Sequence, residues 1–432
     1  MRIKDVYISK LYGIYNHRIL LKPEGLTIIH GANGVGKTAI LKCLKFLFEW
    51  DMDSLSKMPF RMCLIELDNG ISISVTRAAK AEKGNESVSL GLTGPFEIVF
   101  SKGDKVVEVV SGIDPKLLDF SESIADSQPW LKKIRQGLWR DERTEKLVDS
   151  WELVEEYFPK KHKRKKAHSP FFDKMREQIN VKLIDTNRLS ALNDSSEGST
   201  VLGCASDMVK QIRMVNADYA RRAQKLDQTF PHRLIGDNNS FYSPYEVKRR
   251  LKDFEAQQAV LSSIGLLAAF EGPILPTDVD GLSDAKLEAI SLFVQDSEAK
   301  LSAFDELSRR CLALLDLINN KFKNKTLAIN KEYGLSIEDV HKNPIPLDAL
   351  SSGEQHEIVI TYGLLFKTPA KTLLLIDEPE ISLHVAWQKS FIKDLLAVSR
   401  IVGFECLVAT HSPFIVGDNY ELLQSLDGEV DS

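Results

Sequence analysis

The sequence predicts an α/β protein with an antiparallel β lobe, a parallel α/β core and a large, mainly helical insertion. Three patterns support this fold class: hairpin signals near the start, helical periodicity through the middle and strand-length apolar runs near the end. The predicted divisions are an N-terminal lobe at residues 1–112, a helical insertion at 113–340 with a core strand near 179–189, and a C-terminal lobe at 341–432.

The N-terminal lobe is predicted from two turn signals that lie between apolar runs. Gly-containing turns flanked by such runs favour β-hairpins. The first hairpin joins 60–67 to 71–77 through Asp68-Asn69-Gly70, and the second joins 96–100 to 106–110 through Lys102-Gly103-Asp104. One helix, from Lys37 to about Trp50, is expected to interrupt the sheet.

The middle of the chain predicts helices. Residues from about Pro115 to Asn180 and from Ala205 to Asn330 are rich in Lys, Glu, Leu, Ala and Gln. Apolar residues recur there at spacings of three and four, which is typical of amphipathic helices. The individual helical segments read as short, so we expect a compact arm rather than a long rod. Between the two segments, Val181–Arg188 reads as a core strand.

The C-terminal lobe is predicted to be α/β. Thr372–Ile376 and Cys406–Ala409 are uncharged apolar runs of strand length, and Val385–Ser399 between them reads as a helix. Such runs fit a parallel sheet that is covered on both faces.

Composition excludes several classes of protein. The chain has 432 residues, 27% of them charged, and a net charge of −5, so nucleic-acid contacts require a local basic patch. Its five cysteines are scattered, which argues against a disulfide framework or a zinc ribbon. No signal peptide or membrane-spanning stretch is evident, so we expect a cytoplasmic protein without a membrane partner.

The first chemical motif is a glycine-rich loop between an apolar run and a helical segment, the context that a phosphate-binding P-loop requires. Its glycines let backbone N–H groups curl around phosphate oxygens, and the following helix N-terminus favours an anion. Lys37 is expected to reach the β and γ phosphates, and the Thr38 hydroxyl to ligate Mg²⁺. The ATP-binding residues are Gly31, Ala32, Asn33, Gly34, Val35, Gly36, Lys37, Thr38 and Ala39.

The second motif is an apolar strand, 372–376, that ends in Asp377 and Glu378. Ligands bind outside the carboxyl ends of strands in open α/β sheets, so these carboxylates are expected at the site. Asp377 would hold Mg²⁺, and Glu378 would act as the general base on the attacking water.

The third motif, Leu350-Ser351-Ser352-Gly353-Glu354-Gln355, precedes this strand and resembles the signature sequence of ABC ATPases. A helix starting near Gly353 would point its N-terminus and the Ser351 hydroxyl at an anion. The resemblance implies that this anion is the γ-phosphate of ATP bound by a sister subunit, with Ser351, Ser352, Gly353 and Glu354 contributed in trans. At least a dimeric ATPase unit is therefore expected.

The fourth element is Thr410-His411-Ser412-Pro413, which directly follows the apolar run 406–409 and contains His411. It resembles the switch histidine of ABC proteins and is expected to donate a hydrogen bond to phosphate or water. Glu380–His384 resembles the D-loop of the same family, a segment that crosses the dimer interface.

The arrangement of the motifs sharpens the resemblance. Because Lys37 and Asp377 stand near opposite ends of the chain, with the insertion between them, the sequence is similar to the RecF, SMC and OLD group of ATPases. The strings at 351–357, 377–388 and 226–231 further resemble stand-alone ATPases of two-component anti-phage defence systems, such as the PARIS and Septu types. This resemblance implies a separately encoded nuclease or toxin effector as a partner.

Two departures from these families bear on function. ABC heads carry a Gln that contacts Mg²⁺, but no Gln occurs between Thr38 and Arg77, so that role is unassigned. OLD nucleases continue into a Toprim domain, whereas 21 residues follow His411 here, too few for a nuclease domain. No other nuclease motif is evident.

Alternative functions remain open at this point. A DNA-repair or chromosome-maintenance ATPase of the RecF or SMC kind would act directly on DNA, and the basic run Lys160–Lys166 offers phosphate contacts, although a solvated loop accounts for it equally well. A transporter subunit is disfavoured by the missing Gln and the insertion. A scaffold in which ATP is mainly structural would turn over very slowly.

Overall fold

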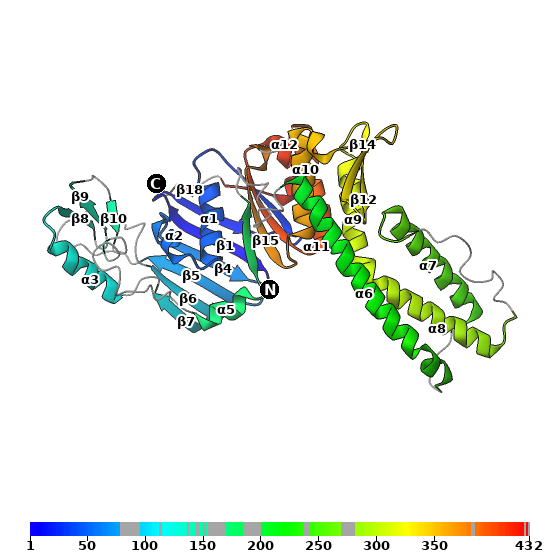
Figure 1. The fold of residues 1–432 in the computed structure, drawn as a ribbon. Helices are drawn as coiled ribbons and strands as arrows, with labels where there is room; N and C mark the ends of the chain where they lie inside the picture. Colours follow the sequence, from blue (N-terminus) through cyan, green and yellow to red (C-terminus); the bar gives the residue numbers. More distant parts are fainter. Residues whose placement is uncertain are drawn as a thin grey trace. The chain divides into compact units, whose positions relative to one another are not determined.

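The computed structural model describes residues 1–77, 96–111, 115–135, 138–143, 147–149, 153, 169–184, 200–236, 242–268, 281–381, 385–426 and 429–430. The chain divides into two compact units, each assembled from segments that are distant in sequence (Figure 1). The first unit comprises Met1–Thr186, Ala370–Ile381 and Gly403–Ser432, and the second comprises Asn187–Pro369 and Ser382–Val402.

An antiparallel sheet forms one layer of the first unit. Its strands lie in the order β18-β2-β1-β4-β5-β6-β7, and both predicted hairpins are confirmed as β4–β5 and β6–β7. The strands are β1 (Ile3–Leu11), β2 (Tyr15–Leu20), β4 (Met62–Leu67), β5 (Ile71–Arg77), β6 (Phe96–Lys102), β7 (Lys105–Ser111) and β18 (Glu429–Val430).

The second sheet of this unit is parallel, in the order β11-β15-β16-β3-β17. Its strands are β3 (Leu26–His30), β11 (Asn180–Ile184), β15 (Thr372–Asp377), β16 (Glu405–Thr410) and β17 (Leu423–Ser425). Every residue of β15 is buried, as the uncharged run predicted. Asp377 is in register with Ala409, and Thr410 with His30, so the carboxyl ends of β3, β15 and β16 meet at one edge.

Helix α1 (Lys37–Phe48) contacts the parallel strands β11, β15 and β16. Its apolar face contributes Ile40, Leu44 and Leu47, each with no exposed surface, to a buried cluster that also takes in residues of both sheets. Fully burying one such side chain stabilises the fold by about 1.5–3 kcal/mol, so α1 is firmly anchored behind the loop that precedes it. The short helices α2 (Met52–Lys57) and α5 (Pro170–Arg176) contribute to the same cluster.

One predicted helical region is partly wrong. Between Pro115 and Asn180 the structure has α3 (Pro115–Asp126) and α5, but also a small antiparallel sheet of β8 (Leu131–Arg135), β9 (Leu138–Asp141) and β10 (Leu147–Asp149). Trp139 is 1% exposed and packs with Ile124 and Leu153. This local packing outweighs a Lys- and Glu-rich composition that favours helix.

The second unit contains the helical arm. Its elements are α6 (Val201–Ile235), α7 (Pro244–Ser263), α8 (Asp284–Leu301), η2 (Ser302–Phe304), α9 (Asp305–Asn319), the antiparallel strands β12 (Lys325–Asn330), β13 (Gly334–Asp339) and β14 (Pro344–Ile345), η3 (Leu347–Ala349), α10 (Ser352–Phe366) and α11 (Val385–Val402).

The expectation of uniformly short arm helices is also wrong. Helix α6 is 35 residues long and continues through Pro231 (Figure 1). Proline removes a helical hydrogen bond, but the last turns of α6 are held by Arg233, whose guanidinium donates to both carboxylate oxygens of Asp296 on α8 at 2.7 and 2.6 Å. Within the described residues, no helix combines the length and apolar character needed to cross a bilayer.

Candidate nucleotide-binding site

The glycine-rich loop occupies the predicted position, between β3 and α1. Gly34 and Gly36 have φ angles of 88° and 98°, a left-handed region that disfavours other residues. A Cβ at Gly36 would also lie 2.4 Å from Leu11 Cδ2, and one at Gly31 would lie 3.2 Å from the Leu426 carbonyl oxygen. Backbone conformation therefore favours glycine at positions 34 and 36, and close packing further disfavours a side chain at positions 31 and 36.

A buried histidine supports this loop. His17 on β2 is 3% exposed, and its Nε2 lies 2.7 Å from the carbonyl oxygen of Val35. The C=O and N–H of a trans peptide point in opposite directions, so this bond directs the N–H of Gly36 away from His17. Burial lowers the pKa of His17, although the hydrogen bond to Val35 opposes that shift. No local sequence pattern signals this contact, because His17 on β2 and Val35 in the loop meet only in the folded protein.

Lys37 begins α1, and its side chain is buried among polar groups. Its ammonium donates to the carbonyl oxygens of Gly31 and Ala32 at 2.9 and 3.1 Å. Burial lowers the pKa of Lys37, and the negative charges of Glu378, Asp377 and Glu380 oppose this lowering. The three carboxylates thus stabilise the charged form of the lysine.

Thr38 and Asp377 come together from α1 and β15. The Thr38 hydroxyl donates to Asp377 Oδ1 at 3.1 Å. A hydroxyl beside a carboxylate is a set of hard oxygen ligands that suits Mg²⁺. The described residues contain no cluster of three His, Cys, Asp or Glu that would enclose a metal. Thr38 and Asp377 are the residues that would hold Mg²⁺ at this site.

Glu378 lies in an unusual backbone conformation. Its φ angle is 44°, a left-handed value that costs a non-glycine residue on the order of 1–3 kcal/mol and is found preferentially at functional sites. Its N–H donates to the carbonyl oxygen of Ala409 at 2.8 Å, which fixes the turn after β15. The carboxylate oxygen Oε1 lies 3.4 Å from Nε2 of His411.

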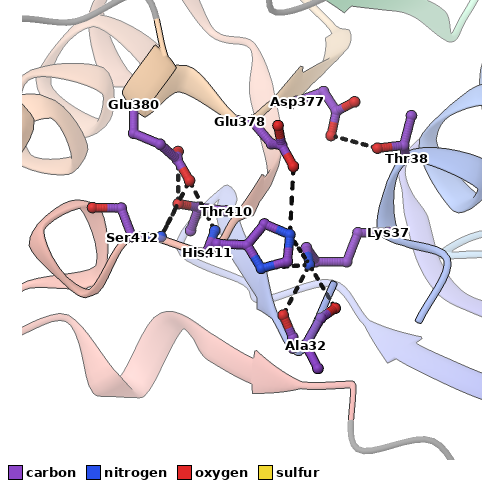
Figure 2. Close-up of polar contacts among 10 residues, drawn as sticks. Ala32, Lys37, Thr38, Asp377, Glu378, Glu380, Thr410, His411 and Ser412 are labelled. Atoms are coloured by element: carbon purple, nitrogen blue, oxygen red, sulfur yellow. Dashed lines mark hydrogen bonds and ion pairs between the residues drawn. The ribbon is translucent and has the colours of Figure 1, made fainter. Parts of the chain in front are cut away.

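His411 follows β16 and turns its ring toward Lys37 (Figure 2). The lysine ammonium lies 3.0 Å from Nδ1 and 2.6 Å from Nε2 of the imidazole. Because an ammonium can only donate, an imidazole nitrogen that accepts from it carries no proton. The structure thus brings together five predicted site residues within the first unit: Lys37, Thr38, Asp377, Glu378 and His411.

The backbone around His411 is held by Glu380, a residue to which the sequence assigned no role of its own. The Glu380 carboxylate accepts from the Thr410 hydroxyl at 2.8 Å, from His411 N–H at 2.9 Å and from Ser412 N–H at 3.1 Å (Figure 2). A spacing of about thirty residues gives no sequence signal for such a contact.

The signature sequence lies in the second unit, at the start of α10. Ser351 is the N-cap and forms a capping box with Glu354, whose Oε2 accepts from the Ser351 N–H at 2.9 Å and hydroxyl at 2.8 Å. Lys325 donates to the same carboxylate at 2.9 and 3.0 Å. Ser351 and Ser352 are exposed. Gly353 packs near Trp387, because a Cβ added to this glycine would lie 3.7 Å from the indole ring. The D-loop residues Ser382–His384 and the basic run Lys160–Lys166 lie outside the described residues.

Similarity searches give a family and two distant folds. The SMC head domain with an extended coiled coil from Pyrococcus furiosus, solved bound to the C-terminal domain of ScpA, is 14% identical, with 96% of this chain and 90% of that chain covered and a TM-score of 0.35. The SMC head domain from Thermotoga maritima is 12% identical, with 98% and 94% covered and a TM-score of 0.31. UvrABC system protein A of Chlamydia pneumoniae is 35% identical over 71 residues, which is 16% of this chain but only 4% of that protein.

A family model matches most of the chain. The family described as "AAA domain, putative AbiEii toxin, Type IV TA system" matches residues 26–417, a span that runs from β3 through the glycine-rich loop, the insertion, the signature helix and β16. The chain belongs to this AAA-domain family and is a nucleotide-binding P-loop ATPase.

Proposed function

We propose that this chain hydrolyses ATP at a site shared between two copies, and that the resulting cycle of closure and release controls a separate nuclease or toxin effector in anti-phage defence. The observation that supports this most is the convergence of Lys37, Thr38, Asp377 and Glu378 in one unit, while an exposed Ser351 heads a helix of the other.

Residues 31–39 form the phosphate cradle in this proposal. The N–H groups of the loop bind phosphate oxygens, and Lys37 neutralises charge on the β and γ phosphates. Thr38 and Asp377 hold Mg²⁺, which, when bound, stabilises charge that builds up on the phosphate oxygens during the reaction.

Glu378 is the general base. It accepts a proton from water as the water oxygen attacks the γ-phosphorus, and the bond from that phosphorus to the β–γ bridging oxygen breaks to give ADP and phosphate. His411, 3.4 Å from Glu378, donates a hydrogen bond to the γ-phosphate or the water. The strained backbone at Glu378 aims the carboxylate at this point.

A sister copy completes the site. Ser351, Ser352, Gly353 and Glu354 at the N-terminus of α10 contact the γ-phosphate held by the other copy, as the resemblance to ABC ATPases implies. The exposure of both serines supports a surface role for this helix end. ATP binding then closes the dimer, hydrolysis opens it, and the helical arm moves with α10.

The family description supports a role in a toxin-type or defence system, since it refers to a putative toxin. The test is to purify the protein from its native host with its bound proteins. We expect a nuclease or toxin to co-purify, and the E378Q variant to bind ATP, fail to hydrolyse it and accumulate as a closed dimer by light scattering. E378Q with normal turnover would refute the role of Glu378.

The alternative is a RecF- or SMC-like ATPase that acts on DNA itself. It is favoured by the basic run Lys160–Lys166, which would bind about five or six phosphates with a steep salt dependence. ATP-dependent DNA binding by the purified protein that weakens sharply between low and physiological salt would support this alternative over an effector.

A further inference from the structure

We infer that Glu380 is a positioning residue that holds the segment Thr410–Ser412 and thereby sets the imidazole of His411 for hydrolysis. The inference rests on the role proposed above for His411. It assigns Glu380 a task separate from that of Glu378, which stands two residues earlier in the chain.

Both carboxylate oxygens of Glu380 accept hydrogen bonds from this segment. Oε1 accepts from two consecutive backbone N–H groups, those of His411 and Ser412, at 2.9 and 3.1 Å. Oε2 accepts from the Thr410 hydroxyl at 2.8 Å, and that hydroxyl oxygen in turn accepts from Ser412 N–H at 2.9 Å. All four distances lie in the range of well-formed hydrogen bonds.

These hydrogen bonds lie just beyond the end of strand β16, where the chain has left the sheet. Strand β16 ends at Thr410, so the N–H groups of the next two residues lie beyond the ladder of the sheet. Hydrogen bonds to a carboxylate are about twice as strong as neutral ones, and two from adjacent residues fix the backbone at His411. The direction in which the imidazole leaves the backbone is then fixed as well.

His411 is consequently held from two sides (Figure 2). Its backbone is bound by Glu380, and its ring faces the ammonium of Lys37 and the carboxylate of Glu378. Glutamine keeps the shape of glutamate but loses its negative charge, so its remaining oxygen can accept from the two N–H groups only through neutral hydrogen bonds, which are about half as strong.

Hydrogen exchange tests the contact directly. In the full-length E380Q variant, we expect the amides of His411 and Ser412 to exchange about tenfold faster or more, since the oxygen that both amides share loses its negative charge and holds them less strongly. The matched control is E421Q, which removes an exposed carboxylate of the same unit and should leave both amides unchanged. Unchanged exchange in E380Q would overturn the inference.

A double-mutant cycle of E380Q and H411A tests whether Glu380 acts on ATP hydrolysis through His411. We expect E380Q to lower kcat for ATP hydrolysis about tenfold or more and to change KM by less than about twofold, because the phosphate cradle is intact. If Glu380 acts through His411, then E380Q should cost nothing further in an H411A background.

The outcomes distinguish the positioning role inferred for Glu380 from the role proposed for His411 in hydrolysis. If E380Q multiplies the defect of H411A, or if the loss falls on KM, then Glu380 does not act through His411 and the inference fails. If H411A lowers kcat but E380Q does not, the inference again fails and the role of His411 stands. If H411A turns over at the normal rate, the proposed role of His411 is wrong and the inference falls with it.

Discussion

Replacing Lys321 with methionine should destabilise the second unit far more than the loss of a surface ion pair. Lys321 follows α9, and its ammonium contacts the carboxylates of Glu357 on α10 and, at 2.7 Å, Asp394 on α11. The three side chains are 12%, 4% and 20% exposed, so the group is mostly removed from water. The K321M change keeps most of the apolar stem and deletes the only charge in the group that opposes the two carboxylates.

The magnitude follows from this burial. An exposed ion pair is worth about 0–1 kcal/mol, whereas removing one partner of a buried pair costs about 3–5 kcal/mol because a charge is left uncompensated. Burial alone would lower the pKa of Lys321, but attraction to Glu357 and Asp394 outweighs it and raises the pKa above 10.5. Because the pKa of this lysine is higher in the folded state, its charged form contributes its full stabilisation below pH 10.5. That contribution is lost as the pH rises through the pKa of Lys321 in the folded protein. At pH 7 we therefore expect the full cost.

Two measurements at pH 7 would give this cost: the free energy of urea unfolding, and the hydrogen-exchange protection of the backbone amides of α10. K321M should lose about 3–5 kcal/mol, and K321M/E357Q should recover about 1–3 kcal/mol of it because one stranded carboxylate is neutralised. A loss below about 1 kcal/mol in K321M would show that water screens the group and would refute the reasoning. The reasoning would also be refuted if the loss in unfolding free energy of K321M/E357Q equalled the sum of the losses in K321M and E357Q.

Three further changes have defined outcomes. Burial lowers the pKa of His17, so the wild-type protein should lose stability relative to H17Q as the pH falls below about 6.5. The measurement is the free energy of urea unfolding of both proteins from pH 7 to pH 5. A difference between the two proteins that stays constant over this range would contradict the prediction. G36A should weaken ATP binding at least about tenfold in a fluorescent-nucleotide titration, since its Cβ would lie 2.4 Å from Leu11 Cδ2 at a φ of 98°; near-normal affinity would mean that the loop tolerates a side chain. G334A should destabilise the second unit by more than about 3 kcal/mol, because its Cβ would lie 1.9 Å from the carbonyl oxygen of Ala205, and a melting temperature equal to wild type would disprove that clash.

Much of the site was predictable because its signals are local. The glycine-rich loop, the helix it opens and the buried strand β15 are each encoded within a dozen residues, and all three appear where the sequence placed them. The capping box at Ser351 is likewise a short-range pattern. Such elements depend on spacing and turn chemistry, which a single sequence carries.

The remaining features depend on contacts between distant residues. His17 reaches Val35 only because β2 lies beside the loop, and Glu380 reaches His411 only because β15 and β16 are neighbours in the sheet. The small sheet around Trp139 formed in a segment whose composition favours helix, because packing around one aromatic ring outweighed propensity. The strained φ of Glu378 has no sequence signature, since glutamate does not favour that region.

Mixing two inactive variants tests most directly whether the nucleotide site is built from two copies of the chain. K37A lacks the lysine of the cradle, and S351R blocks the exposed signature serine, so each variant alone should be inactive. In an equal mixture, half of the dimers are mixed and each carries one intact site, so turnover should recover to about a quarter of wild type. Turnover that stays at the level of the separate variants would contradict a shared site.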